Sequence, residues 1–213
     1  MPRRARLVPE HLPLHLIQRG NNRQTCFHRD ADYIAYLSWL DEYARTSGCA
    51  VHAYVLMSNH VHILASFTAV EGPALLMKGL SQQYSQYFNW WYGRSGTVWE
   101  GRYRSSPVPD ENYFLTCQRY IELNPVRAGM ASTPEEYRWS SYRGNVGMRS
   151  DSLITAHQCY RSLGPTEPQQ QAAYRTLFDD QLNPVVVEEI RRAAKTSAAL
   201  GNPPGRRGRP PKA

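Results

Sequence analysis

The sequence predicts an α+β fold centred on one antiparallel β-sheet. Two observations carry this prediction. Short runs of alternating or continuous apolar residues recur in the first half of the chain, and long segments with apolar residues at helical spacing separate them. With 213 residues, of which 41% are hydrophobic, the chain is long enough to bury one core of ordinary size and to carry an additional segment.

Turn and capping residues divide the first half of the chain into six elements. Gly20-Asn21-Asn22 ends a first strand in which Leu14 and Leu16 share one face. Asp30 can cap the helix that follows. The predicted elements are a strand at 12–19, a helix from Asp30 to about Ser47 stopped by Gly48, strands at 49–57 and 60–66, a helix at 72–92 and a strand within 98–108.

This βαββαβ order is that of ferredoxin-like and RNA-recognition-like domains. It predicts a sheet with both helices on one face and with the other face open for a site. A third helix is expected after the last strand, capped by Asp110 and ending near Leu123, before Asn124-Pro125. One stripe of this helix and its end carries Tyr113, Cys117, Tyr120 and Asn124.

The rest of the chain is predicted to be helical and then disordered. Thr133-Pro-Glu-Glu136 matches a capping box that opens a short helix. Residues 144–152 are rich in Gly and Ser and predict a linker. Two helices are expected beyond it, at 167–182 and 184–200, the second capped by Asn183. The predicted division is a main domain at 1–143, a helical appendage at 144–200 and a disordered basic tail at 201–213, in which Arg207 and Arg209 resemble the core of an AT-hook.

The charge balance indicates a polyanionic partner. Twenty-five Lys and Arg against 18 Asp and Glu give a net charge of +7, and most of the basic residues are arginine, which suits bidentate phosphate contacts. No apolar run is long enough to span a bilayer, which excludes a membrane protein of the helical kind. The N-terminus lacks the apolar core of a secretory signal, and the four cysteines form no Cys-x-x-Cys pair. The expected location is the cytoplasm, in association with the nucleoid.

The strand predicted at 60–66 carries two histidines two residues apart. On a strand, His60 and His62 project from the same face, where two imidazoles can converge on one metal ion or on one phosphate, while Val61 and Ile63 point to an apolar layer. By itself this spacing is a weak signal, because a half-buried strand with two surface imidazoles has the same pattern.

Four blocks of the sequence, taken in order, resemble one family. The chain is similar to the single-tyrosine HUH (His-hydrophobic-His) or IS200-like transposases, and most closely to the REP-associated tyrosine transposases. The resemblance spans about residues 12–143. The blocks are Gln18-Arg-Gly-Asn-Asn-Arg23, Met57-Ser-Asn-His-Val-His62, Trp99-Glu-Gly-Arg-Tyr103 and Arg119-Tyr-Ile-Glu-Leu-Asn-Pro-Val-Arg-Ala128, of which the last is the most specific.

The resemblance implies a catalytic site and a substrate. Tyr120 would be the nucleophile, and His60, His62 and Asn124 would be ligands of a divalent metal ion, Mg²⁺ or Mn²⁺. The family cuts and rejoins single-stranded DNA near hairpins of repetitive extragenic palindromes (REP), through a 5′-phosphotyrosine intermediate. Expected DNA contacts are Arg102, Arg104, Arg119 and Arg127 to the backbone, and Arg19, Asn21 and Arg23 at the cleaved sequence.

Two other functions remain open at this point. A domesticated DNA-binding protein would hold hairpins without cutting them, and a metal-dependent nuclease would use water instead of Tyr120. The oligomeric state is also undecided. Related insertion-sequence enzymes exchange tyrosines within homodimers, whereas the repeat-associated branch acts as monomers, which favours a monomer here.

Overall fold

The structure, a computed structural model, describes residues 12–109 and 111–200 and has the predicted α+β architecture. In chain order the elements are β1 (Leu14–Arg19), the 3-10 helix η1 (Asn21–Arg23), α1 (Asp30–Thr46), β2 (Cys49–Met57), β3 (His60–Phe67), α2 (Gly72–Trp91), β4 (Arg104–Pro107), α3 (Glu111–Glu122), α4 (Asn124–Arg127), η2 (Pro134–Glu136), α5 (Tyr142–Asn145), α6 (Gln158–Arg161), α7 (Glu167–Thr176) and α8 (Pro184–Thr196).

The four strands form one antiparallel sheet in the order β2-β3-β1-β4. This is the strand order of the ferredoxin-like arrangement that the βαββαβ sequence of elements predicts. The register of β1 against β3 pairs Ile17 with His62 and Arg19 with His60. On its other side, β1 pairs His15 with Ser106 and Ile17 with Arg104. Because side chains alternate along a strand, all of these residues project from one face of the sheet.

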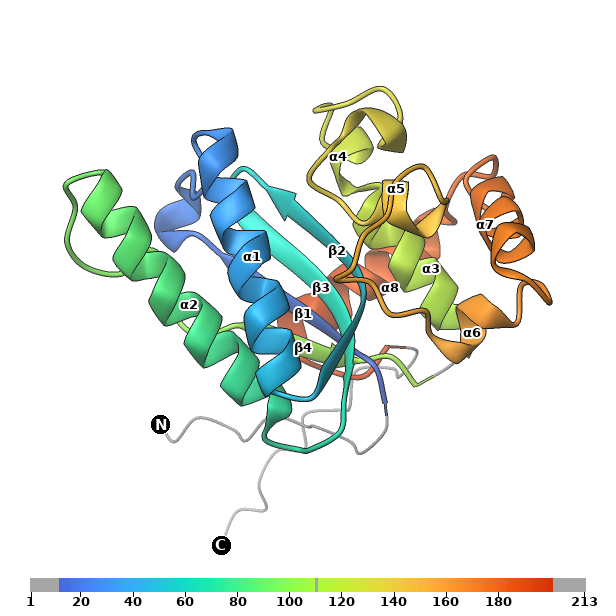
Figure 1. Ribbon diagram of the computed structural model, residues 1–213, viewed down its shortest axis with the longest axis horizontal. Coiled ribbons are helices and arrows are strands. Elements are labelled where there is room, and N and C mark those ends of the chain that lie inside the picture. The colour runs from blue at the N-terminus through green and yellow to red at the C-terminus, as the bar shows by residue number, and fades with distance from the viewer. Residues whose placement is uncertain (1–11, 110, 201–213) are drawn as a thin grey trace, which may run out of the picture.

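Helices lie on both faces of the sheet, whereas helices on one face alone were expected, and the second face is open where the pocket lies. On one face lie α1 and α2, side by side (Figure 1). On the other face, α3 packs on β2 and β3, and α8 packs on β4. Helix α8 was predicted as a helix, but its position on this face was not: it returns to the sheet from far along the chain and packs beside β4. The site lies between these two helices.

The apolar face of the sheet forms the core under α1 and α2. Leu16, Val61 and Ile63 are fully buried there. The face is not wholly apolar, because Gln18 on β1 donates from Nε2 to Ser81 Oγ of α2 at 2.8 Å. Two strands that alternate between apolar and polar side chains therefore place the core on one side and the functional groups on the other.

Several element boundaries differ from the sequence expectations for local reasons. Asp30 is the first residue of α1 and does not cap it. Asp32 performs the capping, and its carboxylate accepts from the backbone N–H of His28 and of Arg29. Thr133 makes no capping hydrogen bond, and the segment after it is only the short η2. The predicted cap at Asp110 and the tail with Arg207 and Arg209 lie outside the described residues.

The segment expected to be a linker is held in place by packing and polar contacts. Tyr54 on β2 donates from its hydroxyl to Asp151 at 2.6 Å, and Arg149 donates to both the Tyr54 oxygen and Asp151. Tyr142, Val146, Tyr160 and Tyr174 form a second apolar cluster next to it.

Helix α8 joins the main core. Ile190 is fully buried in the same cluster as the sheet residues, and the backbone N–H of Leu200 donates to the carbonyl oxygen of Pro107 on β4 at 2.9 Å. As predicted, Asn183 caps the helix, its side chain accepting from the N–H of Val185.

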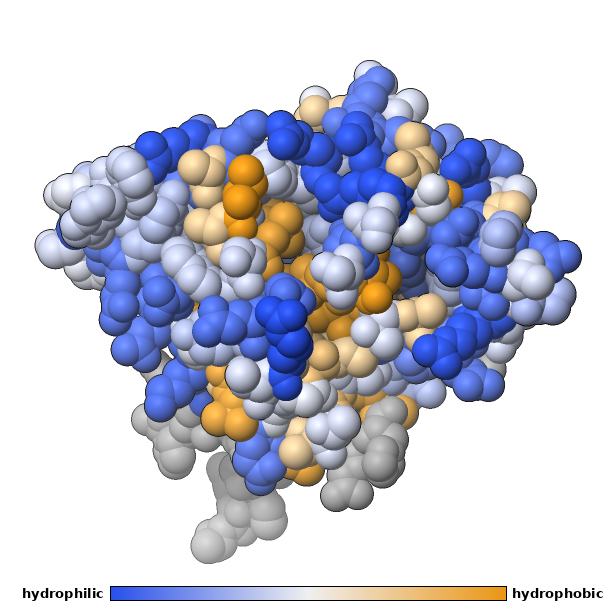
Figure 2. Space-filling view, viewed as in Figure 1, coloured by the Kyte–Doolittle hydropathy of each residue, from blue (hydrophilic) through white to orange (hydrophobic). Residues whose placement is uncertain are grey.

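Hydrophilic residues cover most of the view in Figure 2, and hydrophobic ones surface in its middle and again near its lower edge. One of the exposed apolar side chains of α1 is Ile34, 57% exposed. Among the described residues, no helix is both long enough and apolar enough to cross a membrane.

Candidate active site

A pocket of about 830 Å³ opens on the polar face of the sheet, between α3 and α8. The sheet supplies its floor through Ile17 and Arg19 of β1, and through His60 and His62 of β3. The end of α3 supplies Tyr120, which the structure thus brings to the same cavity as the two histidines. The ring centroids of His60 and His62 are 5.0 Å apart, and those of His62 and Tyr120 are 6.1 Å apart.

Both histidines of β3 are held by hydrogen bonds at Nδ1. His60 Nδ1 lies 2.6 Å from Oδ1 of Asn59, and His62 Nδ1 lies 2.8 Å from Nε2 of His15. Burial lowers the pKa of His60 to about 4, with the charge of Arg19 acting in the same direction. Burial also holds the pKa of His62 well below its usual value. Both imidazoles are therefore neutral at pH 7, and neutral imidazole is the form that binds metal ions.

His15 is a member of the site that the sequence did not reveal. It is fully buried, its ring stacks on His62 with centroids 5.0 Å apart, and burial lowers its pKa to about 3. Alternation along β1 places His15 on the face of Arg19. Only the β1–β3 register, which cannot be read from the sequence, brings it beside His62.

A break in the helix presents Tyr120 and Asn124 to the pocket. α3 ends at Glu122 and α4 begins at Asn124, because Pro125 has no N–H to continue the α-helical ladder. At this break, the carbonyl oxygen of Tyr120 accepts from Nη1 of Arg127 at 3.1 Å. Tyr120 is 5% exposed, so its ring is packed although it lines the cavity.

Arg127 contacts both Tyr120 and Asn124, the two functional residues at this helix end. Its Nη2 donates to Oδ1 of Asn124 at 2.8 Å, and its Cζ lies 4.0 Å from the centroid of the Tyr120 ring. A guanidinium over a phenol ring is a cation–π contact, and it helps to fix the orientation of the Tyr120 ring. The Nδ2 atom of Asn124 is buried and has no partner among the described residues.

The donor set suits a divalent ion held by two imidazoles. Each of His60 and His62 has its Nδ1 engaged and belongs to the pocket wall, which leaves Nε2 for a ligand. In the described part of the chain, no three His, Cys, Asp or Glu side chains gather into a group that could hold a metal. A third protein ligand must then be an amide or a hydroxyl. Asn124 lines the pocket, but its oxygen is engaged by Arg127, so its role as a ligand stays a prediction.

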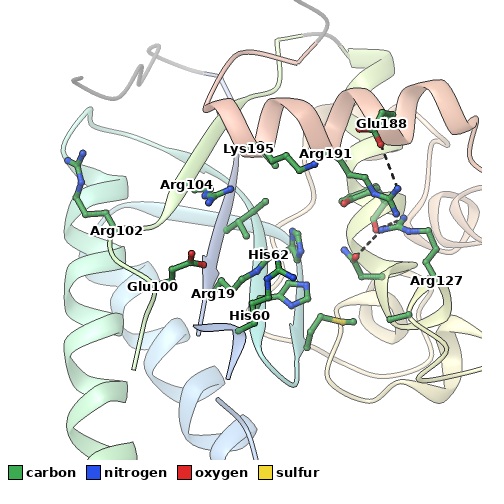
Figure 3. Close-up of a pocket in the computed structure, with 17 residues that line it drawn as sticks. Arg19, His60, His62, Glu100, Arg102, Arg104, Arg127, Glu188, Arg191 and Lys195 are labelled. Atoms are coloured by element: carbon green, nitrogen blue, oxygen red, sulfur yellow. Dashed lines mark hydrogen bonds and ion pairs between the residues drawn. The ribbon is translucent and has the colours of Figure 1, made fainter. Parts of the chain in front are cut away.

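The pocket is strongly basic. Two acidic side chains, Glu100 and Glu188, stand among seven basic ones. Helix α8 carries Arg191 and Lys195 toward the histidines, and Figure 3 shows both side chains projecting from the helix over the cavity. The basic side chains are Arg19, Arg23, Arg102, Arg104, Arg127, Arg191 and Lys195.

The turn after β1 brings Arg23 to the edge of this pocket. Gly20 is required there, because a Cβ at its position would collide with Cys26 Sγ and with the carbonyl oxygen of Gln24. Asn22 and Arg23 have positive φ angles of 50° and 59°, which is uncommon for residues other than glycine. Such strain persists where surrounding contacts enforce it, and here the Asn59 side chain donates to the Arg23 carbonyl oxygen at 3.1 Å.

Of the nine predicted DNA-contacting residues, the structure brings five to the pocket and places two outside it, and the other two lie beyond the described residues. Asn21 lies on η1 and does not line the cavity, and its N–H donates to the carbonyl oxygen of Val98. Arg119 faces the C-terminal segment, where Nη2 donates to the carbonyl oxygen of Asp180 at 2.5 Å. Arg207 and Arg209 lie outside the described residues. The five in the pocket are Arg19, Arg23, Arg102, Arg104 and Arg127.

Three pocket residues on α8 were missed together. Glu188, Arg191 and Lys195 each follow one residue of the predicted apolar stripe Val187, Ile190 and Ala194. They therefore form the polar flank of an amphipathic helix whose apolar stripe is packed on the sheet. The sequence shows that this helix is amphipathic, but it does not show which surface of the fold the helix packs on.

The sequence matches the IS200-like transposases over residues 10–124, more than half of the chain, and the protein belongs to this family of transposases. The fold is similar to that of the REP-associated tyrosine transposase bound to a REP hairpin, with a TM-score of 0.57 at 14% identity, over 75% of this chain and 93% of that one.

Two weaker structural likenesses accompany it. A candidate transposase from Deinococcus radiodurans R1 has a TM-score of 0.40 at 20% identity, covering 57% of this chain and 96% of that one. A bacterial tRNA(His) guanylyltransferase-like protein in complex with GTP has a TM-score of 0.38 at 14% identity, covering 60% and 71%. Among curated proteins, none matches the sequence.

Proposed function

We propose that this transposase cleaves and rejoins single-stranded DNA beside a hairpin, with Tyr120 as the nucleophile and a divalent metal ion, Mg²⁺ or Mn²⁺, at His60 and His62. The observation that carries the proposal is the meeting of these three side chains in one basic pocket, with the His62 and Tyr120 rings 6.1 Å apart. The choice of a hairpin rests on likeness, because the structural relative is bound to a REP hairpin.

The covalent step exchanges one phosphodiester for another. The Tyr120 oxygen attacks the phosphorus, and the bond from phosphorus to the 3′ oxygen breaks. The phenol gives up its proton and the departing 3′ oxygen takes one up, so the products are a 5′-phosphotyrosine and a free 3′-hydroxyl. Because the new bond is again a phosphate ester, attack by another 3′-hydroxyl rejoins the strand without a nucleotide cofactor.

The chain's own residues prepare this step. A phenol with a pKa near 10 is a poor nucleophile at pH 7. Arg127, with its Cζ 4.0 Å from the centroid of the Tyr120 ring, fixes the ring by a cation–π contact. When bound, a divalent ion supplies Lewis-acid polarisation of the phosphate and stabilises the leaving oxygen. Asn124 would be its third protein ligand.

The basic walls of the pocket give the strand a path. Arg104 and Arg19 project from the sheet, and Arg191 projects from α8 above them. Guanidinium groups on both sides of the cavity can bind successive phosphates of one strand. Arg23, on the strained turn at the edge, is placed to contact a base near the cleaved bond. In this proposal a monomer contains a complete site, since Tyr120 already faces His62 of its own chain.

A covalent-adduct assay tests the proposal. The full chain is incubated with labelled single-stranded hairpin oligonucleotides and Mn²⁺ and analysed on a denaturing gel. We expect a shifted band with the wild type and none with Tyr120→Phe or His60→Ala/His62→Ala. Tyr113→Phe is the matched control, because Tyr113 lies on the same helix and its hydroxyl is bonded to Glu189 instead of facing the histidines.

Other outcomes would identify other functions. Cleavage that persists in Tyr120→Phe without any adduct would show a hydrolytic nuclease that uses water. Hairpin binding without cleavage or adduct would show a domesticated DNA-binding protein.

A further inference from the structure

We propose that His15 is a positioning residue: it accepts a hydrogen bond from Nδ1–H of His62 and thereby leaves Nε2 of His62 free for the divalent metal ion. The inference rests on the proposed function for the presence of that ion. His15 does not line the pocket, so it reaches neither DNA nor metal and acts only through His62.

His60 has a corresponding hydrogen bond at its Nδ1, and for this bond the donor and the acceptor can be assigned. Nδ2 of Asn59 donates to the Arg23 carbonyl oxygen at 3.1 Å, which orients the carboxamide. Its Oδ1, 2.6 Å from Nδ1 of His60, can only accept, so the proton of neutral His60 is on Nδ1. Nε2 of His60 then carries a lone pair. A hydrogen-bond acceptor behind the ring thus prepares His60 as a ligand.

His15 takes the place of Asn59 behind the second histidine. Its Nε2 lies 2.8 Å from Nδ1 of His62, within the range of a good hydrogen bond. If His15 were the donor, the proton of neutral His62 would be on Nε2, and an N–H would point into the pocket where a lone pair is needed. The arrangement that matches His60 is the one in which His62 donates and His15 accepts.

The surroundings of His15 hold it in this role. It is fully buried, so no water competes for Nε2. Its own proton is then on Nδ1, an atom without a partner among the described residues. Directly opposite on β4 is Ser106, whose Oγ is also buried and unpartnered. A hydroxyl can accept as well as donate, so a rotation of Ser106 can supply the missing acceptor.

Two substitutions separate positioning from packing. His15→Gln places a carboxamide oxygen, an acceptor, near the position of Nε2, whereas His15→Leu fills a similar volume without an acceptor. The matched control is His52→Leu. His52 is also buried in the sheet and hydrogen-bonded at both nitrogens, to the Thr155 carbonyl oxygen and to Ser66, but it does not line the pocket.

The first measurement is the tautomer of His62 in the metal-free full chain, by long-range proton–nitrogen NMR with ¹⁵N-labelled histidine and assignment through His62→Gln. We expect the proton of His62 on Nδ1 in the wild type and in His15→Gln, and a mixture of tautomers in His15→Leu. A His62 proton on Nε2 in the wild type, or a tautomer unchanged in His15→Leu, overturns the proposal.

The second measurement is the dissociation constant for Mn²⁺, by titration of the same proteins. His15→Leu is expected to weaken binding by about 10- to 100-fold, as loss of a partner behind a metal ligand does. His15→Gln and His52→Leu are expected to stay near the wild type. Equal Mn²⁺ affinity in wild type and His15→Leu overturns the role of His15 and leaves the metal site intact. A wild type that binds no Mn²⁺ removes the metal site itself, and the role of His15 with it.

Discussion

The two sides of α3 hold their functional groups by opposite means. On the pocket side, Tyr120 stands under the exposed guanidinium of Arg127 in a cavity lined mostly by basic residues. On the other side, the Glu122 carboxylate is fully buried and accepts from Ser141, Asn145 and Tyr174, at 2.5, 2.7 and 2.8 Å. No cation is among these partners, so burial raises the pKa of Glu122 to about 7.

The difference shows how a reactive residue can be placed accurately next to open solvent. A groove that must admit a DNA strand cannot be tightly packed, so the helix has to be fixed from behind. The three donors to Glu122 come from the segment after η2, from α5 and from α7. In this account the C-terminal helices position Tyr120 from one side, while α8 completes the pocket on the other.

Removing the anchor behind the helix should have the largest effect. Glu122→Ala leaves three buried donors without their acceptor, and we expect the free energy of unfolding to fall by on the order of 4 kcal/mol. Urea unfolding followed by circular dichroism measures this. A loss below about 1 kcal/mol, within the range of ordinary surface changes, would contradict the role of Glu122 as the anchor of α3.

Removing the Arg127 side chain on the pocket side of α3 should affect catalysis more than stability. Arg127→Ala deletes the contacts to the Tyr120 carbonyl and to Asn124, and we expect adduct formation to slow by about 100-fold, the cost of a small misplacement of reacting groups. Arg127→Lys should recover little, because lysine lacks the planar fork. The control is Arg119→Ala, which faces Asp180 and should react at nearly the wild-type rate. Equal slowing in both variants would erase the proposed distinction between the two sides.

The pH dependence of the free energy of unfolding tests the environment of the buried Glu122 carboxylate. Glu122 has a folded pKa of about 7, against 4.5 for a free glutamate side chain, so the folded state holds the proton more tightly than the unfolded state does. Its contribution is present below pH 4.5 and is lost as the pH rises through 7. Relative to Glu122→Gln, the wild type should lose about 2–3 kcal/mol between pH 5 and pH 8.

Subtracting the free energy of unfolding of Glu122→Gln from that of the wild type cancels the pH dependence of the buried histidines, which has the opposite sign. Burial lowers the pKa of His52 to about 4, so its contribution is lost as the pH falls and is common to both proteins. If the difference in free energy of unfolding does not change with pH, the pKa of Glu122 is not raised in the folded state.

The smallest effect is expected at the outer wall of the pocket. Arg191→Ala/Lys195→Ala removes two cations of α8 that the proposed function assigns to phosphate binding. We expect about tenfold weaker binding of single-stranded DNA and a salt dependence lower by roughly 1.4 in the slope of log K against log salt. Arg192→Ala is the control, because this residue is on the same helix but does not line the pocket. Fluorescence anisotropy at several salt concentrations distinguishes the two. Unchanged binding in the double variant would show that α8 has a structural role only and does not contact the DNA.

The sequence predicted the elements well because their signals are local. Alternation placed His60 and His62 on one face, and Asn124-Pro125 marked the end of the helix that carries Tyr120. What it could not predict depends on contacts between distant segments. His15 meets His62 through strand register, and Arg119 and Arg127 diverge because a helix break separates them.

The pocket wall from α8 was missed for the same reason. An amphipathic pattern shows that the helix has a face to bury but not which surface receives it. The ordered segment at 144–152 is a related case. Its Gly and Ser content predicts a linker, whereas Arg149 and Asp151 tie it to Tyr54, nearly one hundred positions away along the chain.

Whether Tyr120 forms the covalent bond to DNA can be determined by locating that bond in the protein. The adduct from wild-type protein and a hairpin oligonucleotide is digested with nuclease and protease, and the nucleotide-bearing peptide is sequenced by mass spectrometry. The chain has 14 tyrosines, so the assignment discriminates strongly. We expect a 5′-linked nucleotide phosphate on Tyr120 alone. A nucleotide on Tyr113 or on any other side chain, or a cleaved strand with no modified peptide, would contradict this expectation.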